Sequence, residues 1–186
     1  MLAEIVGPRG RVTAVELDGA LAARARASLA PWLQVEVVAG DGCTHDAGEV
    51  DTVIVCAGAT HQAPLWLDRL APGGELMLPL TCESWWGFLL RATRGRADDG
   101  AILLPPARAH NRFAAVSIGR IGIFPCGGGR DEVAATRLRL ALEEALLSDP
   151  QLDVPIAALH RGDPDPDAMD RVWYHGPGFW LERRGA

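Results

Sequence analysis

The first eighty residues alternate short apolar runs with amphipathic stretches. Four apolar runs are bounded by turn residues and are typical of buried parallel strands. They are RVTAVEL (11–17), LQVEVVAG (33–40), VDTVIVCAG (50–58) and ELMLPL (75–80). The third run is almost wholly apolar, which predicts a strand at the centre of a sheet.

Helical patterns separate these runs. Residues 1–6 predict the end of a helix, with Gly7 just past its C-terminus. Residues 20–29 and 62–70 predict two further helices, and Asp18 is a good N-cap for the first of them. Alternating strands and helices predict an α/β fold with a Rossmann-like, mostly parallel sheet.

The pattern changes after residue 82. Residues 85–94 and 112–124 predict two longer strands with no helix between them, so we expect an antiparallel hairpin at one edge of the sheet. Residues 131–149 predict a long helix capped by Asp131, and the tail predicts a strand followed by an aromatic hairpin around a Gly-Pro-Gly turn. We therefore expect one domain over residues 1–126 and a small C-terminal α+β extension over residues 127–186.

Composition narrows the class of protein. The chain has 186 residues and a net charge of -6, so it lacks the basic face that nucleic-acid binding usually needs. Its four cysteines show no CxxC spacing, which predicts no metal site and reduced thiols. No apolar run is long enough to span a bilayer. We expect a cytoplasmic protein with no nucleic-acid or membrane partner; nothing in the pattern indicates its oligomeric state.

Candidate chemistry gathers where the strands end, because ligands of open α/β sheets bind outside the carboxyl ends of the strands. The first strand ends in Glu16, the second in Gly40-Asp41-Gly42 and the third in a small-residue strip that begins with Cys56. An acid on the first strand can accept both hydroxyls of a ribose. Asp41 can accept from an exocyclic amine, and Gly42 lets its backbone approach a flat ring. The three strand ends together predict an adenosine pocket.

Each part taken alone has a plainer interpretation. An acid after a strand is often only the start of the next helix, although Asp18 already fills that position, and a Gly-Asp-Gly sequence is often only a turn. The order of all three along one run of strands favours the pocket. His61, the Trp85-Trp86 pair and the aromatic tail are better explained as surface or core residues.

The same motifs resemble a known family. Residues 1–82 are similar to class I S-adenosylmethionine-dependent methyltransferases, and among these to the protein-L-isoaspartate O-methyltransferases. GRVTAVELD and VVAGDG resemble two strand motifs of that family, and PLWLDRLAPGGELMLPL resembles its later helix, turn and strand. IGIFPC (121–126) is similar to its closing strand.

The resemblance implies a cofactor, S-adenosyl-L-methionine, and a reaction, methyl transfer to the free carboxylate of isoaspartyl residues in proteins or peptides. It implies that Glu16 binds the ribose, Leu17 packs on the adenine, and Asp41 and Gly42 meet the adenine edge. Cys56 would line the methionine side through its backbone. No catalytic residue is assigned, because an ionised acceptor needs no strong base.

The family's first strand and its glycine-rich loop have no counterpart in the sequence. The acid of such a unit usually follows the loop by about 20 residues, and only fifteen residues precede Glu16. We therefore expect an N-terminally truncated chain whose sheet lacks its first strand and whose activity is impaired. The alternatives are a catalytically inactive α/β binding or assembly module, and a methyltransferase with another acceptor.

Overall fold

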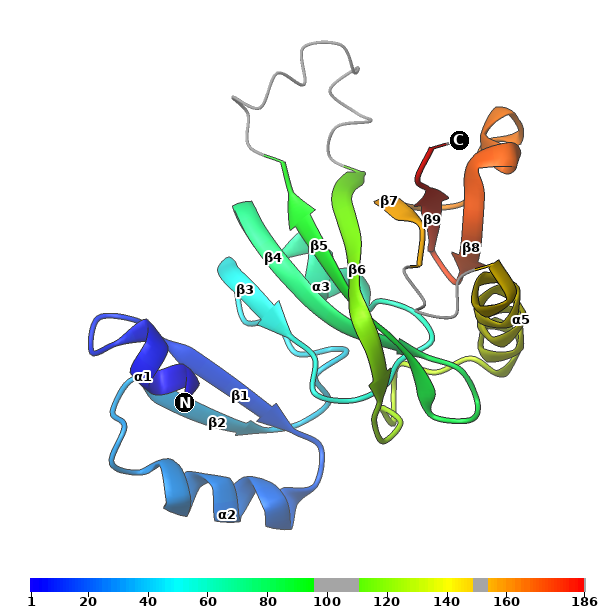
Figure 1. The fold of residues 1–186 in the computed structure, drawn as a ribbon. Coiled ribbons are helices and arrows are strands. Elements are labelled where there is room, and N and C mark those ends of the chain that lie inside the picture. Colours follow the sequence, from blue (N-terminus) through cyan, green and yellow to red (C-terminus); the bar gives the residue numbers. More distant parts are fainter. Residues whose placement is uncertain (96–110, 149–153, 186) are drawn as a thin grey trace. The chain divides into compact units, whose positions relative to one another are not determined.

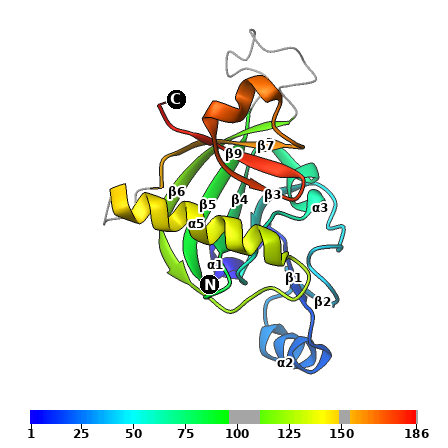
Figure 2. The same cartoon turned by 90° about the vertical axis from the view of Figure 1, so that its right-hand side faces the viewer.

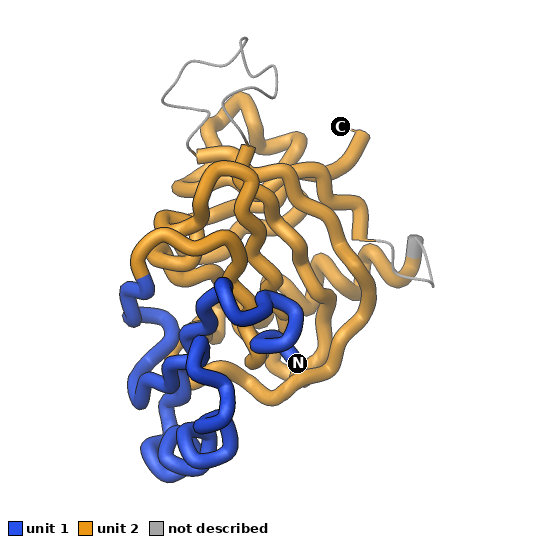
Figure 3. The backbone as a smooth tube through the Cα atoms, turned by 90° about the vertical axis from the view of Figure 1, so that its left-hand side faces the viewer, with its two compact units in different colours: residues 1–47 blue, residues 48–186 orange. Residues whose placement is uncertain are grey.

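The computed structural model of the chain describes residues 1–95, 111–148 and 154–185. The backbone forms two compact units, Met1–Ala47 and Gly48–Ala186 (Figure 3). In residues 1–95, 111–148 and 154–185, no helix combines the length and the apolar character that crossing a membrane requires.

The first unit contains two helices and a two-stranded sheet (Figure 1). In chain order its elements are α1 (Leu2–Val6), β1 (Val12–Glu16), α2 (Gly19–Leu29) and β2 (Val35–Ala39). β1 and β2 pair in parallel, as predicted. Gly7 ends α1 with a φ of 69°, and the Asp18 carboxylate caps α2 by accepting from the backbone of Ala20 and Leu21.

The core of this unit is small. Ala3 and Ala22 are its only buried residues, and every residue of β1 is half-buried. The strand expected within residues 11–17 is present, but the expectation that it is fully buried is wrong. A strand with one neighbour and a helix on one face cannot be enclosed.

The second unit is built on a seven-stranded sheet with the order β3-β4-β5-β6-β7-β9-β8. Its strands are β3 (Val50–Ile54), β4 (Leu70–Thr81), β5 (Trp86–Arg94), β6 (Arg112–Gly122), β7 (Ile156–Arg161), β8 (Val172–Gly176) and β9 (Phe179–Arg183). Its helices are α3 (Pro64–Asp68), α5 (Glu132–Ser148) and the 3-10 helix η2 (Pro166–Arg171). β3 and β4 pair in parallel and the other neighbours pair antiparallel, so the α/β class is confirmed with a mixed sheet.

The core of the second unit lies between this sheet and α5, which crosses one face of the sheet (Figure 2). Leu138 and Leu142 of α5 are fully buried, as are Phe88 and Phe113 of the sheet. The Asp131 side chain accepts from the backbone N–H of Ala134 at 2.7 Å, which confirms the predicted cap. Apolar burial of this extent is the main stabilising contribution to the fold.

Two positions in the sheet differ from the expectation. The β5–β6 hairpin is antiparallel as predicted but lies inside the sheet, because β7 pairs with β6 and the tail strands continue the sheet beyond it. β3, expected at the centre, lies at the end of the seven-stranded order, and the Ile54 side chain is 45% exposed. Its apolar sequence is that of a central strand, while in the described residues only one of its edges is paired.

The Ala-Pro-Gly-Gly segment before the fourth apolar run lies inside β4. The pairing of β3 with β4 shifts from Val50–Leu70 to Thr52–Glu75, so the intervening residues bulge out of the strand. A Cβ at Gly74 would lie 2.8 Å from the carbonyl oxygen of Ala71 and 3.0 Å from that of Asp51. Only glycine therefore fits this bulge without a shift of the backbone.

Candidate functional site

The carboxyl ends of β1 and β2 meet at one edge of the first unit. Glu16, the last residue of β1, pairs with Ala39, and its carbonyl oxygen accepts from the backbone N–H of Gly40 at 2.9 Å. Asp41 follows directly. The parallel register thus brings together the two acids that the sequence analysis selected.

Backbone donors position both carboxylates. Glu16 Oε1 accepts from the N–H of Asp18 at 2.9 Å, and Asp41 Oδ1 accepts from the N–H of Cys43 at 2.9 Å. In the described residues, the second oxygen of each carboxylate has no hydrogen-bond partner. Each acid can therefore accept a hydrogen bond from a ligand without first breaking a contact in the protein.

Leu17 and Gly42 supply an apolar and an open surface beside these acids. The Leu17 side chain is 63% exposed. A Cβ placed on Gly42 would have only Val15 Cβ near it, at 4.0 Å. Two hydrogen-bond acceptors, an exposed leucine and an open backbone fit the ribose and adenine of an adenosine group.

Cys56, the remaining selected residue, belongs to the second unit. It lies just after β3, where the N–H of Val55 donates to the carbonyl oxygen of Met77 at 2.9 Å, and its side chain is exposed. The chain then runs beside the end of β4 through Gly58 and Ala59, a segment called the crossing below. Gly58 forms a parallel bridge with Pro125, and Ala59 forms one with Leu80. The structure thus places Cys56 at the carboxyl end of the β3–β4 pair.

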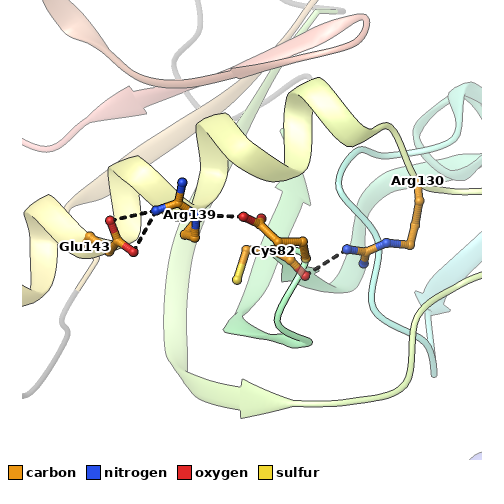
Figure 4. Close-up of polar contacts among 5 residues, drawn as sticks. Cys82, Arg130, Arg139 and Glu143 are labelled. Atoms are coloured by element: carbon orange, nitrogen blue, oxygen red, sulfur yellow. Dashed lines mark hydrogen bonds and ion pairs between the residues drawn. The ribbon is translucent and has the colours of Figure 1, made fainter.

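Arg130 holds this crossing in place, a role that the sequence analysis did not foresee. Its Nη1 donates to the carbonyl oxygen of Gly58 at 3.1 Å and to Thr81 Oγ1 at 3.0 Å. Its Nη2 donates to the carbonyl oxygen of Cys82 at 2.8 Å (Figure 4). The glycine-rich run before Arg130 signals a break in the chain, but it does not reveal which oxygens would approach the guanidinium.

A second hydrogen-bond network surrounds Thr60, two residues after Gly58. Thr60 Oγ1 accepts from the N–H of Asp131 at 2.8 Å and lies 3.1 Å from His61 Nδ1. The hydroxyl of Tyr174 donates toward the Thr60 carbonyl oxygen at 2.9 Å, and burial raises the pKa of Tyr174. Burial also lowers the pKa of His61, although the charge of Asp131 opposes this shift. His61 is therefore neutral at pH 7.

Further along α5, Arg139 pairs with two acids on its exposed side. Its Nε donates to Glu83 Oε1 at 2.6 Å, and its Nη1 donates to Glu143 Oε1 at 2.9 Å (Figure 4). The Arg139–Glu83 pair joins the β4–β5 turn to α5, and the Arg139–Glu143 pair lies within the helix. Exposed pairs of this kind contribute little to stability.

Comparison with known proteins relates the N-terminal half to one family. A family model described as protein-L-isoaspartate(D-aspartate) O-methyltransferase (PCMT) matches residues 1–97. A protein-L-isoaspartate O-methyltransferase of Methanothermobacter thermautotrophicus is 32% identical over 103 residues, which are 53% of this chain and 48% of that protein. Protein-L-isoaspartate O-methyltransferase 1 of Rhodopseudomonas palustris is 36% identical over 103 residues, which are 53% of this chain and 41% of that protein.

The chain thus spans about half the length of the curated relatives it matches. A solved structure of a protein-L-isoaspartate O-methyltransferase superposes with a TM-score of 0.54 and 14% identity, covering 99% of this chain and 59% of that one. At this identity the likeness concerns the fold.

Proposed function

Because the chain belongs to the protein-L-isoaspartate(D-aspartate) O-methyltransferase family, we propose that it takes part in S-adenosyl-L-methionine-dependent methyl transfer to isoaspartyl carboxylates of proteins or peptides. The observation that carries this proposal is the edge at which β1 and β2 end. Glu16 and Asp41 lie there side by side, each with a carboxylate oxygen open to a ligand, within the residues that the family model matches.

The proposal assigns each residue of that edge a binding role. Glu16 accepts hydrogen bonds from the ribose hydroxyls, and Asp41 accepts from the amine of adenine. Leu17 packs on the ring, and the open backbone of Gly42 lets the ring approach. Cys56 lines the methionine side through its backbone.

Methyl transfer to a carboxylate requires mainly that the protein align the two reactants. The cofactor, when bound, supplies an electrophilic methyl group. The acceptor carboxylate is ionised at neutral pH, so one of its oxygens can bond to the methyl carbon as the carbon–sulfur bond breaks, and no proton need move. Catalysis then rests on orienting the acceptor and excluding water from its carboxylate. We assign no general base.

We further propose that residues 1–126 form the methyltransferase domain and that residues 127–186 are an extension that completes its sheet. The pairing of β7 with β6 supports this role for the extension. We also propose that the protein is cytoplasmic, because none of its four cysteines forms a disulfide and reduced thiols are typical of that compartment.

Methyl transfer can be measured directly on residues 1–186. We would incubate the chain with radiolabelled S-adenosyl-L-methionine and two peptides that differ only in carrying isoaspartate or aspartate, and count methyl ester. We expect label in the isoaspartyl peptide alone. Equal labelling of both peptides would indicate another acceptor, and no labelling of either would favour the inactive binding module.

Variants of the two acids test the site itself. Removing one charge-assisted hydrogen bond costs about 1.5–3 kcal/mol, so Glu16→Gln and Asp41→Asn should each weaken S-adenosylhomocysteine binding by about tenfold or more. Glu36→Gln is the matched control, because Glu36 is an exposed acid of β2 that pairs with Arg11. If all three variants bind alike, the β1–β2 edge is not the cofactor site.

A further inference from the structure

A pocket of about 540 Å³ opens in the second unit, and none of the residues assigned to the cofactor lines it. It lies between the start of α3 and the turns that follow β7 and join β8 to β9. The lining residues used below are His61, Gln62, Asn111, Arg161, Gly162 and Gly178. Its size is within the range of small-ligand and peptide side-chain sites.

Gln62 is the unusual member of this lining. Its side chain is 3% exposed, and its Oε1 atom is buried without a hydrogen-bond partner. A buried polar atom in this condition calls for an explanation, because nearly all such atoms are paired. The terminal amide torsion of glutamine is broad and roughly two-fold, so a flip of about 180° exchanges the oxygen and the nitrogen. Gln62 can therefore accept from a ligand in one orientation and donate to it in the other.

His61 offers a matching donor. Thr60 Oγ1 lies 3.1 Å from His61 Nδ1 and 3.5 Å from the carbonyl oxygen of Gly129, and its hydroxyl can donate to either. When it donates to Nδ1, the proton of the neutral ring is on Nε2. The exposed amide of Asn111 adds a further donor and acceptor at the rim. These three side chains are uncharged, and each can hydrogen-bond either the N–H or the C=O of an amide group.

The positive charge in the pocket is already paired. The Arg161 guanidinium forms an ion pair with Asp68 of α3. An anionic ligand would have to compete with that carboxylate, so the lining favours a neutral polar group over a phosphate or a carboxylate.

The rim is fixed by backbone hydrogen bonds. The N–H of Arg161 donates to the carbonyl oxygen of Asn111 at 2.8 Å, and the N–H of Gly162 donates to that of Gly178 at 2.8 Å. A ligand would therefore meet a preformed opening and would not have to order it, which favours affinity.

We infer that this pocket binds a peptide group of an extended polypeptide, with Gln62 as the residue that hydrogen-bonds it. A peptide group presents one N–H and one C=O, which complement the amide of Gln62 and the ring of His61. The choice of a polypeptide rests on the proposed function, in which the methyl acceptor is a protein. The pocket would contact main chain and not the modified side chain, so it would bind aspartyl and isoaspartyl peptides alike.

The test is a titration of ¹⁵N-labelled full chain with a neutral blocked peptide, N-acetyl-Gly-Ala-Gly-Ala-amide, followed through the side-chain amide signals of Gln62. We expect saturable shifts of those signals. Gln62→Leu keeps the volume and removes the hydrogen bonds, so the dissociation constant should rise about tenfold. Gln34→Leu is the matched control, because Gln34 lies in the first unit and donates to the carbonyl oxygen of Ala3.

Three outcomes would overturn the inference: no binding of the peptide, shifts that avoid Gln62, or equal binding by Gln62→Leu. Each would leave the pocket to water. Asn111→Ala provides a second variant at an exposed position, where folding is not at stake, and should weaken the peptide by about threefold or more. Thermal unfolding of each variant verifies that it is folded.

Comparing the two peptides of the methylation assay separates this inference from the proposed function. If the pocket binds peptide but the protein is no methyltransferase, both peptides bind with the same dependence on Gln62 and no ester forms. If the protein methylates isoaspartate but the pocket is not used, ester forms and KM for the peptide is the same in Gln62→Leu.

Discussion

At the scale of single residues, the end of β4 depends on contacts between parts of the chain that are distant in sequence. Arg130 joins Gly58 to Thr81 and Cys82, which come from two separate segments of the second unit. Gly58 is equally constrained, because a Cβ there would lie 2.3 Å from Thr81 Oγ1. The close approach of Gly58 and Thr81 is what allows one guanidinium to reach all three oxygens.

Replacing Arg130 by methionine should destabilise the fold. The substitution keeps most of the side-chain volume but leaves the carbonyl oxygens of Gly58 and Cys82 without this donor, at a cost of about 1–3 kcal/mol in the free energy of unfolding. Urea denaturation measures the change. Arg137→Met, at an exposed position of the same region, is the control and should change stability by less than about 0.5 kcal/mol. Equal effects of the two variants would show that Arg130 does not stabilise the crossing.

Gly58→Ala should also destabilise the fold, by about 1–3 kcal/mol, because the new methyl group overlaps Thr81 in a buried site. Gly19→Ala, at the start of α2, has open space around the added methyl and gains helix propensity, so it should be neutral or stabilising. Thermal unfolding of both variants tests the pair. A Gly58→Ala protein as stable as the parent would mean that the crossing is looser than the structure shows.

At the scale of elements, the tail of the chain is part of the main sheet. β7 and β9 pair through five residue pairs, and a polar cluster on these strands joins them to β6 and η2. His160 stacks on Trp180 with 3.9 Å between ring centroids, and its Nε2 lies 2.7 Å from Glu182 Oε2. Arg112 and Arg171 also pair with Glu182.

The pKa shifts in this cluster predict that the free energy of unfolding decreases in acid. Burial lowers the pKa of His160 below its usual 6.5, despite the opposing hydrogen bond to Glu182. Burial works against ionisation of Glu182, but the hydrogen bond and charge of His160 and the two arginines prevail and lower its pKa below 4.5. Below about pH 6.5 the unfolded chain binds a proton at His160 that the folded chain resists, so the free energy of unfolding falls as the pH falls. The Glu182 contribution is lost in turn below about pH 4.5.

Urea denaturation at a series of pH values from about 7.5 to about 5 would measure how steeply the free energy of unfolding depends on pH. His160→Phe retains a ring to stack on Trp180 but cannot titrate, so its stability should depend less steeply on pH below about 6.5. His61 contributes with the same sign and is unchanged in both proteins, which leaves a residual slope. His175→Gln is the control, because His175 is only half-buried and its Nε2 lies 3.0 Å from the exposed Asp163. A His160→Phe slope equal to that of the parent would contradict the role given to the cluster.

At the scale of the whole molecule, the two units differ in how much they bury. In residues 1–47 only Ala3 and Ala22 are buried, whereas the second unit contains all the large side chains that are fully buried, among them Phe88 and Phe179. Local stability follows the amount of buried apolar contact. The residues proposed to bind adenosine therefore belong to the less stabilised unit.

Native-state hydrogen exchange should show this difference. We expect the amides of β1 and β2 to exchange faster than those of β4, β5 and β6, because the first unit buries only Ala3 and Ala22 and opening it costs less free energy. Peptide-resolved exchange measured by mass spectrometry tests the order. Equal protection of the two units would show that they unfold together.

Cofactor affinity is a second property of the whole chain. Glu16, Leu17, Asp41 and Gly42 lie in the first unit and Cys56 in the second, and in the described residues no strand of one unit pairs with a strand of the other. We therefore expect residues 1–186 to bind S-adenosylhomocysteine more weakly than the low-micromolar range. Calorimetric titration of the purified chain measures this, and a low-micromolar dissociation constant would contradict the expectation.

The local elements and the family could be predicted from the sequence. Caps such as Asp18 and Asp131 follow from short-range patterns, because each bonds residues two or three positions away. The parallel β1–β2 pair, which places Glu16 beside Asp41, follows from the strand–helix–strand order. The remaining features were set by tertiary contacts. That β3 lies at an edge, that the β5–β6 hairpin is interior, and that Arg130 and Gln62 occupy special sites all depend on long-range pairing, and an apolar or polar pattern gives no information about which distant segment will be the partner.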